Sequence, residues 1–242
     1  MILPAQMNFR DLGGIPAEGG RYIKPGLLFR SGDFYSLSAE DVGKLETLKL
    51  AMIIDLRARR EIDRRPDKII STVRKTIHID IHDDARDKAE KFLENNDAKG
   101  LETVLIGDYL RMVDIHQEDF SRFLHILATT DSLPLVYHCA AGKDRTGMAT
   151  VFLLAALGVD MKKIWEDYMA TNAFIAGYMD TIIAKVTQSG LNGEILRPLL
   201  EVRTEYLQAA LDRIEFKYNG LQVYVRETLG ADVAVLQQKY LS

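Results

Sequence analysis

The chain has 242 residues and a single cysteine, Cys139, so an intrachain disulfide is excluded. It also lacks a strong excess of charge of one sign, since its formal net charge is −4. A chain of this kind has no overall field that attracts nucleic acid, and no nucleic-acid partner is expected. Its longest apolar run, Val151 to Val159, is too short to cross a bilayer, so no transmembrane segment is expected either.

Signals for export are equally scarce. The N-terminal residues, Met1 to Ala5, lack the basic region and long apolar stretch of a secretory signal peptide. Because a lone reactive thiolate works best in a reducing compartment, the cytoplasm is the expected location. A leader peptide that had been removed would leave no trace, so secretion is the alternative. Nothing in the sequence indicates an oligomeric state.

The composition is that of one globular unit. Hydrophobic residues make up 47% and charged residues 27%, enough for one well-buried α/β core, and no repeat or linker divides the chain. We therefore expect a single domain over residues 1–242. Apolar runs predict strands at 48–56, 72–81 and 133–138. Helical patterns cover 38–48, 85–93 and 101–113, with a break at Gly100, and then 146–157, 160–189, 194–200, 204–218, 221–229 and 233–241. This order predicts a central sheet flanked by helices, with a helical C-terminal half.

The chemistry is concentrated around Cys139. The residues from 138 to 147 read His-Cys-Ala-Ala-Gly-Lys-Asp-Arg-Thr-Gly, after an apolar strand and before an apolar helix. The five residues between Cys139 and Arg145 allow a tight loop to turn its backbone N–H groups inward around a tetrahedral anion. The positive end of the helix adds to this field and favours the thiolate, which is the nucleophilic form. A buried core cysteine followed by a chance arginine is the alternative.

Each loop residue has an expected task. Arg145 binds two phosphate oxygens through its planar guanidinium, and Gly142 gives the backbone the freedom that the loop needs. Thr146 donates its hydroxyl to the thiolate of Cys139. The remaining phosphate-binding positions are Ala140, Ala141 and Lys143. Together these features predict a cysteine-dependent phosphatase that needs no metal or other cofactor.

The loop resembles that of the protein tyrosine phosphatase superfamily, and Lys143-Asp144 narrows the resemblance to bacterial tyrosine/serine phosphatases with a GKDRTG loop. This group includes relatives that act on phosphoinositides. The resemblance implies a protein tyrosine phosphatase-like fold and a phospho-cysteine intermediate. Further stretches extend the likeness along the chain: Asn8 to Gly14, Leu28 to Ser31, Ile53 to Arg57, and Asp167-Tyr168 with Asn172.

The general acid has more than one candidate. Asp144 lies within the loop, and the resemblance implies that it donates the proton to the leaving group. Alternatively, Asp144 only caps the following helix. In dual-specificity relatives the acid lies on a loop after a comparable strand, which makes Asp83 or Asp84 the other candidates.

Three residues are expected to support the loop. Asp55, at a strand end, orients Arg145 or Arg57 through a charge-assisted hydrogen bond, or forms an ordinary ion pair. His138 holds the loop through hydrogen bonds of its ring.

A second group of polar residues lies at the end of the strand predicted at 72–81. Strand alternation would place His78, Asp80 and His82 on one face, but a solvated strand face explains these residues better than a metal site does, and no metal is expected.

The expected substrates are phosphorylated proteins or phosphoinositides. Lys143 adds a positive charge that suits a substrate with several phosphates, or else it only steers anions toward the site. The segment from 84 to 113 forms a lid with Phe92 and Tyr109 as apolar contacts, or serves as scaffold. The rival functions are a rhodanese-like sulfurtransferase and a non-catalytic phosphate-binding module.

Overall fold

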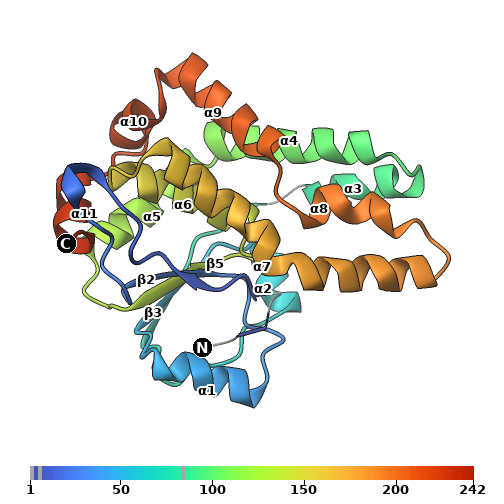
Figure 1. Cartoon of the computed structure of the whole chain (residues 1–242), viewed down its shortest axis with the longest axis horizontal. Coiled ribbons are helices and arrows are strands. Elements are labelled where there is room, and N and C mark those ends of the chain that lie inside the picture. The colour runs from blue at the N-terminus through green and yellow to red at the C-terminus, as the bar shows by residue number, and fades with distance from the viewer. Residues whose placement is uncertain (1–2, 5–6, 83–84) are drawn as a thin grey trace.

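The computed structural model describes residues 3–4, 7–82 and 85–242, and no side chain is described from 83 to 87. A five-stranded sheet in the order β1-β2-β5-β3-β4 forms its centre (Figure 1). β1 is antiparallel to β2, and the other neighbouring pairs are parallel. The strands are β1 (Arg10–Asp11), β2 (Leu28–Ser31), β3 (Met52–Asp55), β4 (Lys75–His78) and β5 (Leu135–His138).

The central strand β5 fixes the position of the loop that follows it. Its last residue, His138, is in register with Ser31 of β2 and Asp55 of β3. The ends of three parallel strands therefore meet at one edge of the sheet, and Cys139 is the first residue beyond this edge. All four residues of β5 are buried, as expected for a strand that is covered on both faces.

Helices cover both faces of the sheet (Figure 1). On one face, Phe29, Ile53 and Val136 pack in a cluster with Leu45 of α1 (Ala39–Thr47). On the other face, the main core joins the sheet to α4 (Ala98–Asp114), α5 (Gln117–Thr129) and α6 (Asp144–Ala156). The chemistry of the capping box explains where α1 begins, because Ser38 accepts from the backbone of Asp41.

The C-terminal half of the described chain is helical, as predicted, and the fold is α/β with a flanked central sheet. After α6 come α7 (Met161–Gln188), η3 (Gly193–Leu196), α8 (Arg197–Leu200), α9 (Thr204–Tyr218), α10 (Leu221–Val223), the π-helix η4 (Tyr224–Thr228) and α11 (Val233–Tyr240). Between the strands lie η2 (Glu18–Gly20), α2 (Arg59–Arg64) and α3 (Ala85–Glu94). Within the described part of the chain, every helix is too short or too polar to serve as a membrane span.

The structure corrects several expected elements. β3, β4 and β5 lie within the predicted strands, but β1, β2, α2 and α5 were not predicted. The predicted break at Gly100 was wrong, because Gly100 lies in the first turn of α4 and the chain leaves its helical path at 95–97. A side chain at position 100 would collide with the ring of Phe92, so the glycine serves the close packing of α3 on α4.

Candidate active site

Cys139 lies at the base of a loop between β5 and α6. Its side chain is buried, and α6 begins with Asp144 and Arg145 in its first turn. Gly142 has a φ of 65°, a conformation that L side chains rarely adopt. A Cβ atom there would lie 2.5 Å from the backbone of Ser31 and Gly32, so the loop packs directly on the end of β2. The expected need for glycine at this position is confirmed by this geometry.

A buried network of hydrogen bonds and ion pairs holds the loop at the carbonyl group of Gly142. The carbonyl oxygen of Gly142 accepts from Asn8 Nδ2 at 2.7 Å and from Arg30 Nη2 at 2.9 Å. Arg30 is fully buried and pairs through Nη1 with Asp167 Oδ2 at 2.6 Å. Arg10 pairs with the other oxygen of Asp167 at 2.8 Å. The motifs at 8–14, 28–31 and 167–168 thus converge on one carbonyl group of the loop.

The charged part of this network consists of two arginines that share one carboxylate. Burial alone would raise the pKa of Asp167, but the charges of Arg30 and Arg10 outweigh burial and lower this pKa below its usual value. Burial and the nearby charge of Arg30 lower the pKa of Arg10 to about 10. Removing Asp167 would leave two guanidinium groups without their counter-charge, and that of Arg30 is fully buried, which is strongly destabilising.

The side chain of Arg145 is oriented by the carboxylate of Glu61, a contact that was not predicted. Its Nη1 and Nη2 lie 2.5 Å and 2.9 Å from the two oxygens of Glu61 on α2, and Nη1 also donates to the carbonyl of Ile81 at 3.2 Å. Arg145 is buried. Asp55, which we expected to orient Arg145 or Arg57, binds Arg57. Of the two partners expected for Asp55, the structure therefore has Arg57, and Glu61 orients Arg145.

Asp55 belongs to a second charged cluster beneath the loop. Arg57 is buried and donates to both oxygens of Asp55, with Nη2 2.7 Å from Oδ2 and equally close to Asp67 Oδ2. The ring of His138 lies between the same two carboxylates, with Nε2 3.3 Å from Asp67 and Nδ1 3.1 Å from the carbonyl oxygen of Cys139. His138 thus contacts the loop through its ring, as expected.

Burial opposes the charged form of His138, but Asp55 and Asp67 outweigh it and raise the pKa of His138 to about 9. At neutral pH the ring is therefore an imidazolium that donates to the carbonyl of Cys139. Asp55, Asp67 and His138 lie close enough together to suggest a metal ion, but the guanidinium of Arg57 already binds an oxygen of each carboxylate.

Asp144 does not act as a side-chain cap of α6. The residue before the helix is Lys143, which makes no side-chain cap hydrogen bond, and Asp144 is the first helical residue. The carboxylate of Asp144 instead accepts from the hydroxyl of Tyr109 at 2.9 Å and pairs with Lys143 Nζ at 2.7 Å. The alternative in which Asp144 only caps the helix is wrong.

Thr146 differs from expectation. Its hydroxyl is buried and has no hydrogen-bond partner among the described residues, so the expected donation to Cys139 is not made in this structure. The hydroxyl lies within the first turn of α6, where a bound oxyanion or thiolate would supply an acceptor.

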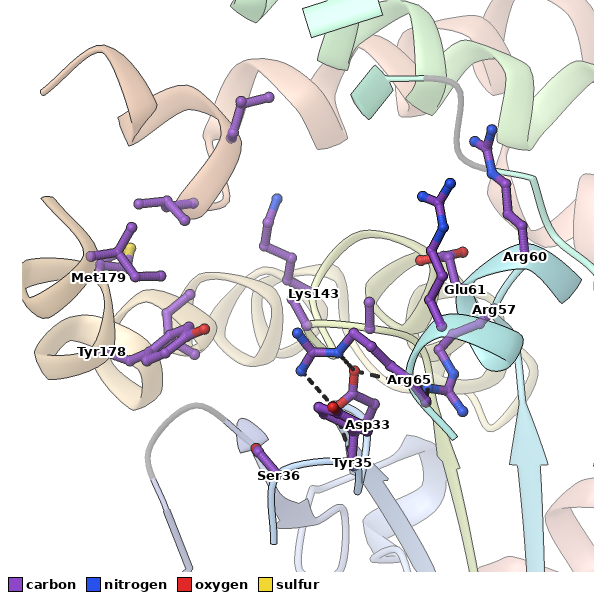
Figure 2. A pocket seen from close by; sticks show the side chains of 17 residues that line it. Asp33, Tyr35, Ser36, Arg57, Arg60, Glu61, Arg65, Lys143, Tyr178 and Met179 are labelled. Atoms are coloured by element: carbon purple, nitrogen blue, oxygen red, sulfur yellow. Dashed lines mark hydrogen bonds and ion pairs between the residues drawn. The ribbon is translucent and has the colours of Figure 1, made fainter. Parts of the chain in front are cut away.

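A cavity of about 490 Å³ opens at the loop (Figure 2). Ala140, Ala141 and Lys143 form its loop side. One wall carries the charged residues Asp33, Arg57, Arg60, Glu61, Arg64 and Arg65. The opposite wall is largely apolar and consists of Ile175, Tyr178, Met179, Ile182, Leu199 and Leu200. With Lys143 the lining holds five cationic side chains and two carboxylates, so the cavity favours anions although the chain as a whole is weakly acidic.

Other expected residues lie apart from this arrangement. β4 ends at His78, whose Nε2 lies 2.6 Å from the carbonyl oxygen of Arg57, so Asp80 and His82 do not continue its strand face. Asp83 and Asp84 lie outside the described residues. Tyr109 is buried in the main core, and Phe92 packs in a cluster with residues of α3 and α4, as in a scaffold, while the lid role of this segment stays a prediction.

The sequence interpretation missed Glu61 and Asp67. Both lie in the polar stretch from 59 to 68, which carries no apolar pattern that would indicate a helix or a site. The motifs containing Arg30 and Asp167 were noticed through resemblance, but nothing local indicated that these two residues bind each other.

Known proteins support the assignment that the geometry suggests. The chain is 33% identical over 238 residues to a protein of Cupriavidus necator named as a tyrosine-protein phosphatase, covering 97% of this chain and 86% of the relative. It is 30% identical over 264 residues to the triple specificity protein phosphatase PtpB of Mycobacterium tuberculosis, covering 93% and 92% of the two chains.

Solved structures that align with this chain are more distant. The core catalytic domain of the PP-IP phosphatase SIW14 from S. cerevisiae aligns with a TM-score of 0.41 and 16% identity, over 78% of this chain and 96% of that one. TpbA of P. aeruginosa aligns with a TM-score of 0.38 and 15% identity, over 98% and 93%. The model of the tyrosine phosphatase family matches residues 1–242. The chain therefore belongs to the tyrosine phosphatase family and is a phosphatase that acts on phosphorylated substrates.

Proposed function

We propose that this protein hydrolyses phosphomonoesters through a phospho-cysteine intermediate formed on Cys139, within one catalytic domain that spans residues 1–242. The observation that carries the proposal is the placement of Cys139 and Arg145 on either side of a loop that faces an anion-favouring cavity. In the first step the Sγ–P bond forms while the P–O bond to the leaving group breaks. Water then attacks phosphorus and releases phosphate and the free thiolate.

The loop supplies the electrostatic part of catalysis. The non-bridging oxygens of the phosphate are bound by backbone N–H groups of the loop, among them those of Ala140, Ala141 and Gly142. The N-terminus of α6 also contributes to this binding. Arg145, held by Glu61, adds a fixed positive charge for the oxygens whose charge is stabilised in the transition state. Thr146 donates its hydroxyl to the thiolate when Cys139 leaves phosphorus.

We assign the general acid role to Asp144. Its carboxyl group lies at the start of α6 beside Lys143, a residue that lines the cavity. When Lys143 turns to a substrate phosphate, the carboxyl oxygen that it held takes up a proton from solvent and then gives it to the leaving group. Asp83 and Asp84 remain the alternative donors.

The substrates that we propose are phosphotyrosine in proteins, with phosphoserine, phosphothreonine and phosphoinositides as further members. The excess of cationic side chains in the cavity supports acidic or multiply phosphorylated substrates. We place the enzyme in the cytoplasm, where the thiol of Cys139 stays reduced. Secretion through a removed leader is the alternative.

The deciding experiment replaces the nucleophile. Cys139→Ser should abolish hydrolysis of phosphotyrosine peptide while vanadate binding persists, and wild-type turnover should be unchanged in the presence of a chelator. Full activity of the Cys139→Ser variant, or complete loss of wild-type activity in chelator, would contradict the covalent mechanism.

A further inference from the structure

A pair of buried tyrosines, neither of which lines the cavity beside the loop, lies next to Asp144. Tyr109 of α4 is fully buried, and its hydroxyl lies 2.9 Å from Asp144 Oδ1 and 2.9 Å from the hydroxyl of Tyr168 on α7. An ionised carboxylate has no proton to give, so Tyr109 donates to Asp144, and the hydroxyl of Tyr168 divides its single proton between Tyr109 and the carbonyl oxygen of Arg203, 3.3 Å away. Burial raises the pKa of both phenols well above the ordinary value, which keeps both hydroxyl protons in place.

The two oxygens of Asp144 have different surroundings. Oδ1 accepts from Tyr109, which belongs to the main core, whereas Oδ2 pairs at 2.7 Å with Lys143, which lines the cavity. Lys143 also lies 2.9 Å from Oδ1, so the ammonium alone does not distinguish the two oxygens. The hydroxyl of Tyr109 does distinguish them, because a phenol whose proton already points at Oδ1 favours a protonated carboxyl group that carries its proton on Oδ2.

We propose that Tyr109, held by Tyr168, is a positioning residue that turns Oδ2 of Asp144 toward the leaving group. This role rests on the proposed function, in which Asp144 is the general acid. The proton passes from Oδ2 to the bridging oxygen while the Sγ–P bond forms and the P–O bond breaks. The leaving group departs as a neutral alcohol, and Asp144 is left as a carboxylate that Tyr109 stabilises. In the second step the same carboxylate takes a proton from the attacking water.

Asp167 and Tyr168 of α7 connect to two different parts of the loop. Asp167 reaches the loop through Arg30, which donates to the carbonyl of Gly142. Tyr168 reaches the start of α6 through Tyr109, which donates to Asp144. Two consecutive residues of one helix thereby hold both the phosphate-binding turn and the acid.

The test compares leaving groups. Tyr109→Phe keeps the ring and removes the hydroxyl. We therefore expect kcat to fall about tenfold on phenyl phosphate, whose leaving group is a poor one. On a nitro-substituted phenyl phosphate, which departs without a proton, kcat should change less than about twofold, and KM should be unchanged for both substrates.

The chain offers a matched control. Tyr206 is also buried, its ring lies 5.7 Å from that of Tyr109, and its hydroxyl donates to the carbonyl of Pro198 at 3.1 Å rather than to Asp144. Tyr206→Phe should therefore affect both substrates alike. Tyr168→Phe should give a smaller loss than Tyr109→Phe in the same selective direction, and it replaces that variant if Tyr109→Phe does not fold.

The outcomes separate the inference from the proposed function. If Tyr109→Phe and Tyr168→Phe slow both substrates equally, as Tyr206→Phe does, the positioning role is wrong while Asp144 can still be the acid. If Asp144→Asn itself shows no dependence on the leaving group, both the acid assignment and the positioning role are overturned. In that case Asp83→Asn and Asp84→Asn identify the donor. The covalent mechanism is tested independently by Cys139→Ser.

Discussion

Glu61 binds the guanidinium of Arg145 end-on, with its two carboxylate oxygens 2.5 Å and 2.9 Å from Nη1 and Nη2. The two residues are 84 positions apart, and α2 brings the carboxylate to the start of α6. A paired arginine has one orientation rather than many, so this contact prepares Arg145 for a phosphate before the substrate arrives.

We expect Glu61→Gln to lower kcat/KM for a phosphotyrosine peptide about tenfold, because an amide loses one charge-assisted hydrogen bond to Arg145. The control is Asp63→Asn on the same helix, whose exposed side chain pairs with Arg59. Steady-state kinetics of the two variants check the prediction. Wild-type kcat/KM in Glu61→Gln would show that Arg145 is positioned without this carboxylate.

Lys143 is expected to bind the additional phosphate groups of a polyphosphorylated substrate. Lys143→Ala should slow hydrolysis of polyphosphorylated inositides more than that of a phosphotyrosine peptide, and the remaining rate should depend less on salt. Lys163→Ala on α7 is a suitable control, because Lys163 pairs with Glu166 at the surface. Equal losses on both substrates would reduce Lys143 to a steering charge or to a partner of Asp144.

The sequence predicted the parts of this molecule that local pattern encodes. β3 and β5 are apolar runs, and α9 is amphipathic with its stop at Asn219-Gly220, so their periodicity and turn residues located them. The loop from Cys139 to Thr146 was equally visible, because its nucleophile, turn and guanidinium are contiguous. For α5 the pattern was present at Phe120, Phe123 and Leu127, and it was overlooked.

Other parts depend on residues that are distant in the sequence. β2 contains Arg30, which reads as unfavourable in a buried strand, and its charge is balanced by Asp167, 137 residues further along the chain. The short helix α2 is polar, and only the folded structure shows that it places Glu61 against Arg145. Resemblance located some of these residues, but the pairing of charges between segments follows only from the fold.

The charge on His138 predicts how stability varies with pH. Its pKa is raised to about 9 in the folded protein, whereas an unfolded histidine titrates near 6.5. Protons bind the folded state more tightly, so the contribution to stability is complete below about pH 6.5 and is lost as the pH rises through about 9. The free energy of unfolding should fall by up to about 3 kcal/mol over this window.

Urea unfolding at several pH values checks this prediction. The Cys139→Ser variant is the proper background, because it lacks the reactive thiol and the change in stability then belongs to the other groups of the site. In that background Asp67→Asn should make the decline shallower, since one of the two carboxylates that raise the pKa of His138 is gone. A stability profile that is flat from pH 6.5 to 9 would mean that His138 is neutral in the folded protein.

Gly142 should be intolerant of any side chain. Its φ of 65° is strained for alanine, and a Cβ atom would lie 2.5 Å from the backbone of Ser31 and Gly32, which cannot move aside as a flexible side chain could. We expect Gly142→Ala to lose at least about 2 kcal/mol of stability and to bind vanadate poorly, because the loop must shift away from β2. Gly43→Ala in the exposed middle of α1, where nothing lies near the added atom, should instead gain about 0.5–1 kcal/mol and retain full activity. Thermal unfolding and vanadate titration of both variants measure the contrast, and an active, stable Gly142→Ala would mean that the loop is not set by its contact with β2.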